Sequence, residues 1–361
     1  MKRIKSSISF IANLGLFVLM FAATICNAQS NAHQLLLALS KENHTLALVD
    51  PSTLKVIAKV PVGEDPHEVI ASSDGKTAFV SIYGGGSLHT INVIDLITHK
   101  RLDDIDTRPL FGPHGLTFVN NKLWFTVEGS KAIGCYDPST KKIEWAMGTG
   151  QDRTHMIYVT NNAKKIYTTN VASGTVSILQ DTLMHFAPPR NMPNMPSPSQ
   201  NKMPPPPMQA HENWEQILIN VSNGCEGFDV SPDSTELWTA SAEDGKIYII
   251  NLATKQLEQT IDANVHGANR LKFTTDGKMV FISSLGSGNL TVYDAKTRSL
   301  IKQINIGNGA AGILMQPDGA KVYVACTPDN YVTVIDLKTL AVINKIDVGG
   351  GPDGLAWATT R

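Results

Sequence analysis

The sequence predicts an all-β fold, a seven-bladed β-propeller with four antiparallel strands in each blade. Three observations lead to this prediction. A unit of about 42 residues recurs along the chain, each unit contains four short strand patterns, and the two ends of the chain hold complementary parts of one unit. A period of this length with four strands per unit is typical of propeller blades rather than of helical solenoids.

The clearest unit lies near the C-terminus and shows how one blade is built. The dipeptide Asp318-Gly319 predicts the turn between its first two strands, and residues 336–339 predict the turn before its last strand. Alternating apolar and polar residues predict four strands, at Gly312–Met315, Lys321–Ala325, Tyr331–Asp336 and Leu340–Val348.

Two positions mark the repeat along the whole chain. One is an Asp or Asn that closes the third strand, at Asp50, Asp95, Asp137, Asp181, Asn251, Asp294 and Asp336. The other opens the first strand, at His67, His114, His155, Glu226, Asn269, Ala311 and Asp353. Successive members of the second series are 47, 41, 71, 43, 42 and 42 residues apart, so six intervals define seven units and one interval holds an insertion.

The two ends of the chain are expected to share the last blade. After Asp353 only one strand fits, whereas residues 35–62 contain three strands that lack a first. Residues 353–360 and 35–62 together make one complete blade, with its innermost strand from the C-terminus. This pairing closes the ring and leaves no inner blade edge open.

The segment KVYVACTPDNYVTVIDLKTLAVINKIDVGGGPDGLAW, residues 321–357, resembles the YVTN-repeat propellers, in which a tyrosine-containing strand, a polar turn and a V-x-V-I-D strand recur. The resemblance extends over residues 35–360. It implies a seven-bladed propeller similar to the exported, YncE-like bacterial proteins, which are mostly non-enzymatic or of unassigned function. Resemblance of this kind implies architecture and compartment, and little chemistry.

The first 28 residues have the pattern of a secretory signal peptide. Lys2, Arg3 and Lys5 form a positive start, residues 11–21 are mostly apolar, and Cys26 and Ala28 offer small residues for cleavage. No later stretch is apolar for long enough to cross a bilayer. We therefore expect a periplasmic or secreted protein without a transmembrane segment, in which residues 29–361 form a single, monomeric propeller.

Charge and cysteine content exclude several classes of protein. The formal net charge is −1 and no basic run follows the N-terminal segment, so neither nucleic acid nor an anionic membrane surface is an expected partner. Three cysteines, Cys135, Cys225 and Cys326, remain after cleavage. An odd number excludes a fully paired disulfide framework, and we interpret all three as small apolar residues in strands.

The long interval contains a Pro- and Met-rich insertion at about residues 182–213, between the third and fourth strands of one blade. Its proline runs predict an extended or disordered loop. Thioether and imidazole groups suit Cu(I), at Met184, Met192, Met195, Met203, Met208, His185 and His211. The alternative is a spacer whose methionines have no specific role.

The residues that open the first strands should form a ring at one mouth of the central channel. Four consecutive blades contribute His67, His114, His155 and Glu226, which we interpret as a site for a divalent transition metal, Zn²⁺ or Cu²⁺. Asp353 lies outside this arc. The alternative is a water-filled polar vestibule in which these side chains bind backbone.

Further polar residues are expected at the same mouth and could bind a small ligand, namely Tyr83, Glu128, Arg153, Asn269, Arg270 and Asp353. Glu128 could be another metal ligand or the acceptor that fixes an imidazole tautomer. We therefore expect an exported binding protein for a metal ion or small ligand. Two alternatives stay open, a metal-dependent lyase or lactonase-like enzyme at the same mouth and a scaffold that binds another protein.

Overall fold

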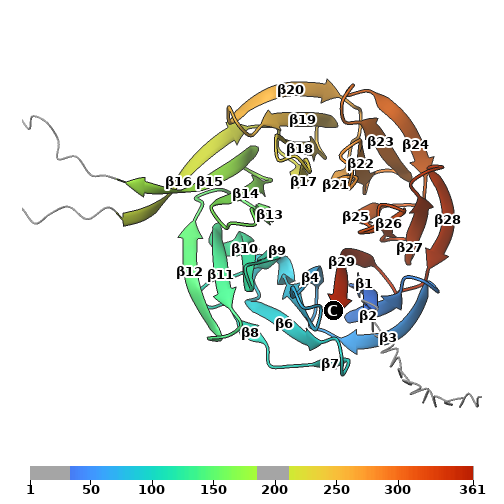
Figure 1. The fold of residues 1–361 in the computed structure, drawn as a ribbon, viewed down its shortest axis with the longest axis horizontal. Helices are drawn as coiled ribbons and strands as arrows, with labels where there is room; N and C mark the ends of the chain where they lie inside the picture. Colours follow the sequence, from blue (N-terminus) through green and yellow to red (C-terminus); the bar gives the residue numbers. More distant parts are fainter. Residues whose placement is uncertain (1–32, 185–210, 361) are drawn as a thin grey trace, which may run out of the picture. The chain divides into compact units, whose positions relative to one another are not determined.

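The computed structural model describes residues 33–184 and 211–360. These residues form a ring of seven antiparallel sheets, which confirms the predicted seven-bladed β-propeller (Figure 1). The predicted signal peptide at residues 1–28 and most of the predicted insertion lie outside the described residues. No helix in the described part of the chain is long and apolar enough to span a bilayer.

Each blade runs from an innermost to an outermost strand, and the first four blades after the N-terminal strands are as follows. Blade 1 contains β4 (Pro66–Ala71), β5 (Thr77–Ile82), β6 (Thr90–Asp95), β7 (Lys100–Arg101) and β8 (Ile105–Asp106). Blade 2 contains β9 (Pro113–Val119), β10 (Lys122–Val127), β11 (Ala132–Asp137) and β12 (Lys142–Gly148). Blade 3 contains β13 (Thr154–Val159), β14 (Lys165–Asn170), β15 (Thr175–Met184) and β16 (His211–Asn220). Blade 4 contains β17 (Cys225–Val230), β18 (Glu236–Ser241), β19 (Lys246–Asn251) and β20 (Gln256–Asp262).

The remaining blades complete the ring, and two short 3₁₀ turns, η1 (Gly84–Gly86) and η2 (Glu128–Ser130), follow β5 and β10. Blade 5 contains β21 (Ala268–Phe273), β22 (Met279–Ser284), β23 (Asn289–Asp294) and β24 (Leu300–Asn305). Blade 6 contains β25 (Ala310–Met315), β26 (Lys321–Cys326), β27 (Tyr331–Asp336) and β28 (Ala341–Ile346). Blade 7 contains β29 (Pro352–Thr360), β1 (His33–Ser40), β2 (Thr45–Asp50) and β3 (Lys55–Pro61).

Blade 7 confirms the predicted closure. Its strand order is β29-β1-β2-β3, so the C-terminal strand is innermost and pairs with the N-terminal strand. The register joins Leu36 to Trp357 and Ala38 to Leu355. Because β29 pairs with β1, the ring closes through backbone hydrogen bonds between the two ends of the chain.

The hydrophobic core lies between neighbouring blades. One cluster joins Phe281 and Val292 of blade 5 to Ile313 and Val324 of blade 6, all of them fully or almost fully buried. Second and third strands therefore present apolar residues to both adjacent blades, which explains the runs of four or five buried residues in most of them. This packing fixes the angular position of each innermost strand around the channel.

Two local features differ from the expected pattern. The outer strand of blade 1 is split into β7 and β8, which both pair with β6, and Asp104 between them accepts hydrogen bonds from Asn92 and Arg101. In blade 3, backbone pairing of β15 with β16 continues to Met184 and His211. The strands therefore extend two to three residues into each end of the predicted insertion at about residues 182–213. The β15–β16 pair extends outward beyond the ring (Figure 1).

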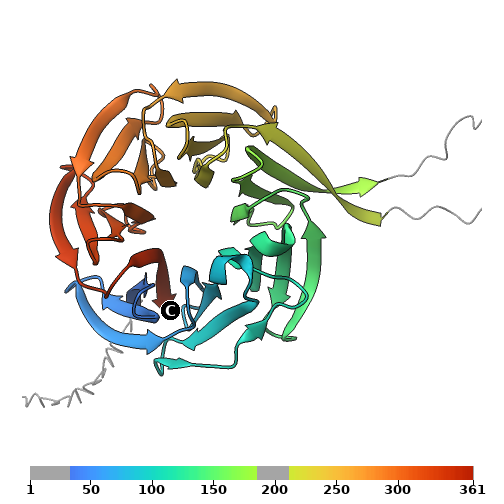
Figure 2. The ribbon, with the colours of Figure 1, turned by 180° about the vertical axis from the view of Figure 1, so that it is seen from behind.

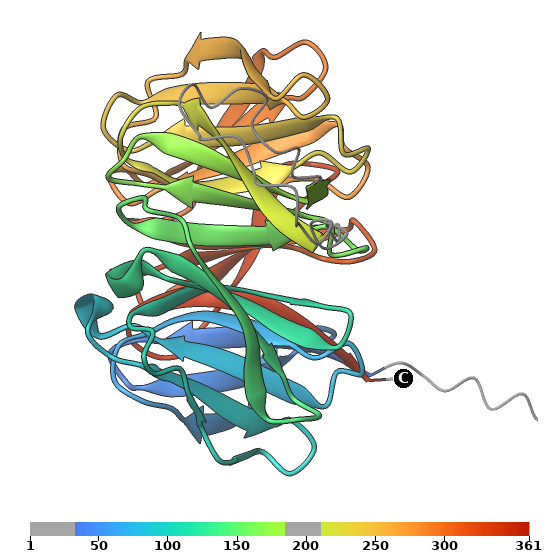
Figure 3. The same cartoon turned by 90° about the vertical axis from the view of Figure 1, so that its left-hand side faces the viewer.

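Strands run back and forth between the two faces of the ring (Figure 3). All innermost strands begin at the face that carries η1 and η2, which is the left-hand face in Figure 3 and the near face in Figure 2. The antiparallel order then places the end of β15 and the start of β16 at the opposite face. The first residues of the innermost strands, far apart in the sequence, are thereby gathered at one mouth.

Candidate functional site

A cavity of about 370 Å³ lies at this mouth of the channel. The ring residues of the repeat all occupy the second position of their innermost strand. Equivalent positions of the seven strands therefore lie around the cavity. Nine of the ten predicted site residues line it, namely His67, Tyr83, His114, Arg153, His155, Glu226, Asn269, Arg270 and Asp353. The tenth, Glu128, lies against His155.

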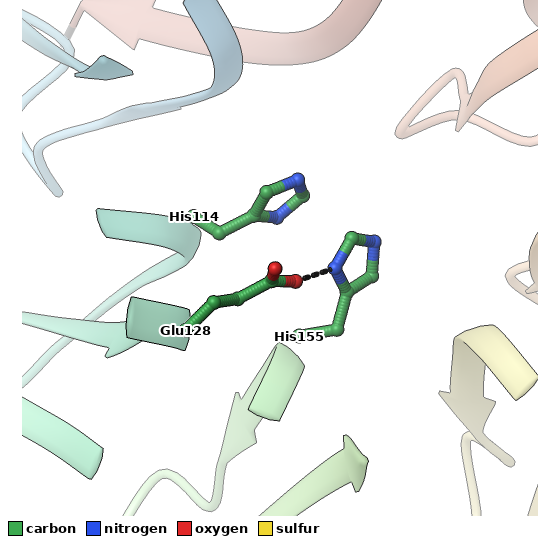
Figure 4. Close-up of side chains that lie close together, drawn as sticks. All are labelled: His114, Glu128 and His155. Carbon is green, nitrogen blue, oxygen red and sulfur yellow. Dashed lines mark hydrogen bonds and ion pairs between the residues drawn. The ribbon is translucent and has the colours of Figure 1, made fainter. Parts of the chain in front are cut away.

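His114, Glu128 and His155 form the tightest cluster of metal-ligating groups at the mouth (Figure 4). One ligand atom from each residue lies within 4.8 Å of the others, and all three residues are buried. The two imidazole rings lie 3.9 Å apart between centroids and are tilted by 32°. Glu128 reaches them from the start of η2, directly after β10. These residues could hold a metal ion.

The imidazole of His155 is oriented by a carboxylate. Its Nδ1 donates a hydrogen bond to Glu128 Oε1, the dashed line in Figure 4. In a neutral imidazole the other nitrogen, Nε2, then carries the lone pair. That Nε2 is buried without a hydrogen-bond partner and lies 3.8 Å from Glu226 Oε2. A carboxylate that holds one imidazole nitrogen while the other stays free is the usual arrangement behind a metal-ligating histidine.

The imidazole of His114 is fully buried and also has a free nitrogen. Its Nδ1 has no hydrogen-bond partner, while Nε2 lies 3.1 Å from His67 Nδ1. Burial, together with the nearby His155 and His67, holds the pKa of His114 well below its ordinary value. The ring is therefore neutral near pH 7, which is the protonation state that binds metals.

His67 is brought to the cluster, but both of its nitrogens have partners. Its Nε2 lies 2.7 Å from Lys41 Nζ and 2.9 Å from Asp65 Oδ1, and its Nδ1 faces His114. Burial lowers the pKa of His67, so this ring too is neutral near pH 7. Among the three ring histidines, His67 is thus the one whose nitrogens are least available to an ion.

Glu226 and Glu128 are tied into a hydrogen-bonded network at the rim. Asn269 Nδ2 donates to Glu226 Oε2 at 2.6 Å, and Arg153 Nη2 donates to Glu226 Oε1 at 3.3 Å. Arg153 Nε also lies 3.6 Å from Glu128 Oε2, to which the Tyr83 hydroxyl donates at 2.5 Å. Two carboxylates therefore share one guanidinium, and each carboxylate keeps an oxygen directed at His155.

A buried ion pair bridges the channel. Arg270 of β21 donates to Glu68 of β4, on a blade across the ring, and their side chains are 8% and 12% exposed. Asp353 of β29 is buried beside them, and this burial raises its pKa despite the neighbouring Arg270 and Lys41. The predicted ligand residues Arg270 and Asp353 therefore have partners within the protein.

The charges around the mouth favour a cation. The three bases at the mouth are Lys41, Arg153 and Arg270. They face six carboxylates, of Glu42, Asp65, Glu68, Glu128, Glu226 and Asp353. The formal charge of the mouth is therefore −3 when the histidines are counted as neutral. A concave site with this balance attracts positive ions and raises their local concentration.

Sequence reasoning missed Lys41, Asp65 and Glu68. For Glu68 a signal existed, because it directly follows the ring residue, as Arg270 does. Four other blades have glycine at this position, and a Cβ there would approach the backbone of the next innermost strand to within 2.2–2.5 Å. Glu68 and Arg270 are the two charged residues at a position that is glycine in four blades and Met156 in blade 3, and their opposite charges indicate a pair that spans the ring. Lys41, in the turn after β1, gave no such signal.

All three described cysteines, Cys135, Cys225 and Cys326, are buried and unpaired, which agrees with their interpretation as small apolar residues. Burial raises the pKa of Cys135 and of Cys225 to about 12. These thiols are therefore protonated at neutral pH and are neither nucleophiles nor metal ligands in this form.

Comparison with known proteins supports the fold. A family model described as the cytochrome D1 heme domain matches residues 146–319, which is less than half of the chain. No curated protein sequence matches. The similar solved structures include a proposed 6-phosphogluconolactonase from Bacteroides uniformis, with 14% identity over 90% of this chain and 99% of that one and a TM-score of 0.67.

Two further structures resemble the chain at similar identity. Hydrazine synthase from Kuenenia stuttgartiensis is 15% identical, with 81% of this chain and 89% of that one covered and a TM-score of 0.61. The dihydro-heme d1 dehydrogenase NirN, in complex with DHE, is 13% identical, with 87% and 63% covered and a TM-score of 0.58. At these identities the likeness shows the fold alone.

The described mouth does not fit a haem. A macrocycle needs broad apolar faces, and ligand pockets for such groups are lined mainly by apolar side chains. Here Leu285 and Ala311 are the only aliphatic side chains on the described lining. The Arg270–Glu68 pair also crosses the channel. The small, mostly polar lining therefore suits a single ion better than a tetrapyrrole.

Proposed function

We propose that this protein is an exported propeller that binds a divalent transition-metal ion, Zn²⁺ or Cu²⁺, at the mouth of its channel. The observation that carries the proposal is the buried, unpartnered Nε2 of His155, held in place by Glu128 and directed at Glu226. A buried imidazole nitrogen without a partner is costly, and a metal ion is the ligand that its lone pair favours.

The distances suit an ion between His155 and Glu226. Zinc–nitrogen and zinc–oxygen bonds are about 2.0–2.2 Å long, so two ligand atoms of one ion lie about 3.4–4.2 Å apart for bond angles from tetrahedral upward. The separation of His155 Nε2 and Glu226 Oε2, 3.8 Å, falls in this range. His114 supplies the third ligand through its free Nδ1, after a change of rotamer or a small shift of the ring.

Glu128 and His67 would have different roles in this site. Glu128 fixes the tautomer and direction of His155, and it is near enough to His114 to join the ligands directly. His67 contacts His114 and would orient that ring rather than bind the ion itself. Of the predicted metal ligands, the proposal keeps His114, His155 and Glu226 and gives His67 an orienting role. Glu128 is added as the second carboxylate.

Export is part of the proposal and rests on the pattern of the first 28 residues. The three described cysteines are unpaired but buried, so their thiols are shielded from oxidation, which is compatible with an oxidising compartment. The lactonase-like structure is 14% identical and supports the fold alone. The proposal therefore rests on the geometry of the mouth, which supports metal binding.

The test is a titration of metal-free protein with Zn²⁺ and Cu²⁺, with residues 185–210 replaced by a short turn so that the insertion contributes no ligands. His155→Ala should weaken binding more than about 100-fold, and Glu128→Gln about 10–100-fold, the usual effect of losing an imidazole's acceptor. His266→Ala is the matched control, because His266 is an exposed histidine on the loop that leads into blade 5. Equal affinities in wild type and His155→Ala would refute the proposal.

A further inference from the structure

The turn that leads into each innermost strand has a left-handed residue two positions before the ring residue. In five blades this residue is glycine, which adopts the conformation without strain. In blades 1 and 3 it is Asp65, with φ 54°, and Arg153, with φ 53°. The glycines, with φ from 55° to 78°, are Gly112, Gly224, Gly267, Gly309 and Gly351.

A side chain at this position is unfavourable, so its presence in two blades calls for a reason. Non-glycine residues with positive φ also occur in other turns of the described chain, but at this position only Asp65 and Arg153 replace the glycine of the other five blades. Contacts around such a residue can maintain the strain where it serves a site. The two exceptions precede His67 and His155, in blades that contribute to the proposed metal site. Asp65 is used locally, because its carboxylate contacts Lys41 and His67.

Arg153 is different, since its side chain is 45% exposed and lies over the metal-ligating cluster. Its guanidinium makes one hydrogen bond, 3.3 Å long, to Glu226 and one ion pair, at 3.6 Å, with Glu128. A guanidinium has five N–H donors, so most of them remain directed at the cavity or at solvent. The other two cations of the cavity are already engaged, Lys41 by three groups and Arg270 by the buried Glu68.

We propose that Arg153 recognises the carboxylate of a small organic acid, and that a second oxygen of this acid, adjacent to the carboxylate, ligates the metal ion. This inference rests on the proposed metal-binding function. In the metal-free protein the guanidinium neutralises Glu128 and Glu226. An ion bound to His155 and Glu226 takes over that neutralisation and frees the planar fork for an external carboxylate, which it binds through two parallel hydrogen bonds.

The size and lining of the cavity limit the ligand. A volume of about 370 Å³ is at the small end of ligand pockets, and its described lining is mostly polar or charged. The channel is bridged by Arg270 and Glu68, so the ligand is held at the mouth. A compact acid with few carbon atoms fits this space, and a long-chain or aromatic acid does not.

The experiment uses Co²⁺-loaded full-length protein, whose visible absorption reports ligands that join the metal, titrated with glycolate and with its neutral analogue glycolamide. Wild type should bind glycolate at least about 10-fold more tightly than glycolamide, as expected for a charge-assisted, two-bond contact. Arg153→Gly restores the residue found in the other blades, and should lose that preference while it binds Co²⁺ at least as tightly as wild type.

Lys131→Gly is the matched control. Lys131 is an exposed cation on the same face, also left-handed with φ 50°, and it pairs with Asp152 rather than with the cluster. This variant should bind glycolate as wild type does, and Arg153→Gln provides a second test that keeps a long side chain. Wild type that binds no Co²⁺ would overturn the metal site and this inference with it. Tight Co²⁺ binding with equal glycolate affinity in wild type and Arg153→Gly would overturn the role of Arg153 alone.

Discussion

Replacement of Arg270 by Met should destabilise the propeller strongly, because Arg270 is the cation that neutralises the buried centre of the channel. Its side chain is 8% exposed, it donates to Glu68, and it lies 4.0 Å from Glu226. Asp353 is buried in the same group, and Arg270 is the leading influence that lowers its pKa against the effect of burial. Loss of the guanidinium leaves these carboxylates to repel one another.

The size of the effect follows from this geometry. Removing one partner of a buried ion pair costs about 3–5 kcal/mol, because the remaining charge is left desolvated and unpaired. The two side chains here are 8% and 12% exposed, so the upper part of that range applies. The double variant Glu68→Gln with Arg270→Met removes both charges of the pair and should recover about half of the loss, since a pair replaced as a whole is often nearly neutral.

Urea unfolding at pH 7, followed by far-UV circular dichroism, measures the effect as a shift of the midpoint at constant slope. Arg108→Met is the control, because it removes the same side chain from an exposed pair with Asp106 and should leave the midpoint unchanged. A shift for Arg270→Met as small as that of Arg108→Met would refute the account of a charge-balanced channel.

Three further predictions follow from the fold. Truncation after Gly351 removes β29, which pairs with β1 and places Leu355 and Ala356 in the core, so the melting temperature should fall strongly. An unchanged melting temperature would contradict the closure. Replacement of residues 185–210 by Asn-Gly should leave melting unchanged, since β15 and β16 pair up to Met184 and His211 and a two-residue turn closes that register; an unfolded product would show that the segment is needed for packing. Burial keeps the pKa of His114 below 6.5, so below pH 6.5 the unfolded chain binds more protons than the native one and stability falls on acidification. Urea midpoints at pH 7 and pH 5 should therefore differ less in His114→Gln than in wild type, and an equal difference would place the titrating group elsewhere.

The repeat explains why so much of the fold could be predicted. Each blade carries its own strand pattern and turn signal, so an unclear pattern in one blade can be interpreted from the equivalent segments of the other six. The incomplete units at the two ends then left one way to close the ring, through residues 353–360 and 35–62. Details that depend on single side chains were not predictable in this way, such as the split of the outer strand in blade 1 at Asp104.

The site was predictable in position and only partly in chemistry. Equivalent positions of a propeller lie on one ring, so the repeat alone predicts that His67, His114 and His155 lie together. Side-chain direction does not follow from the repeat. Lys41, in the turn after β1, contacts Nε2 of His67. Glu128, directly after β10, accepts a hydrogen bond from Nδ1 of His155 on the neighbouring blade. The missing glycines at positions 65 and 153 are visible in the repeat, and they point to Arg153 as an unusual residue.

The most direct test of the metal site is an anomalous-difference map from crystals of the protein grown with Zn²⁺, collected on either side of the zinc absorption edge. We predict a peak about 2.0–2.1 Å from His155 Nε2, with Glu226 as a second ligand and His114 or Glu128 completing the site. A map with no peak at the channel mouth, or with a peak that leaves His155 Nε2 unliganded, would contradict it.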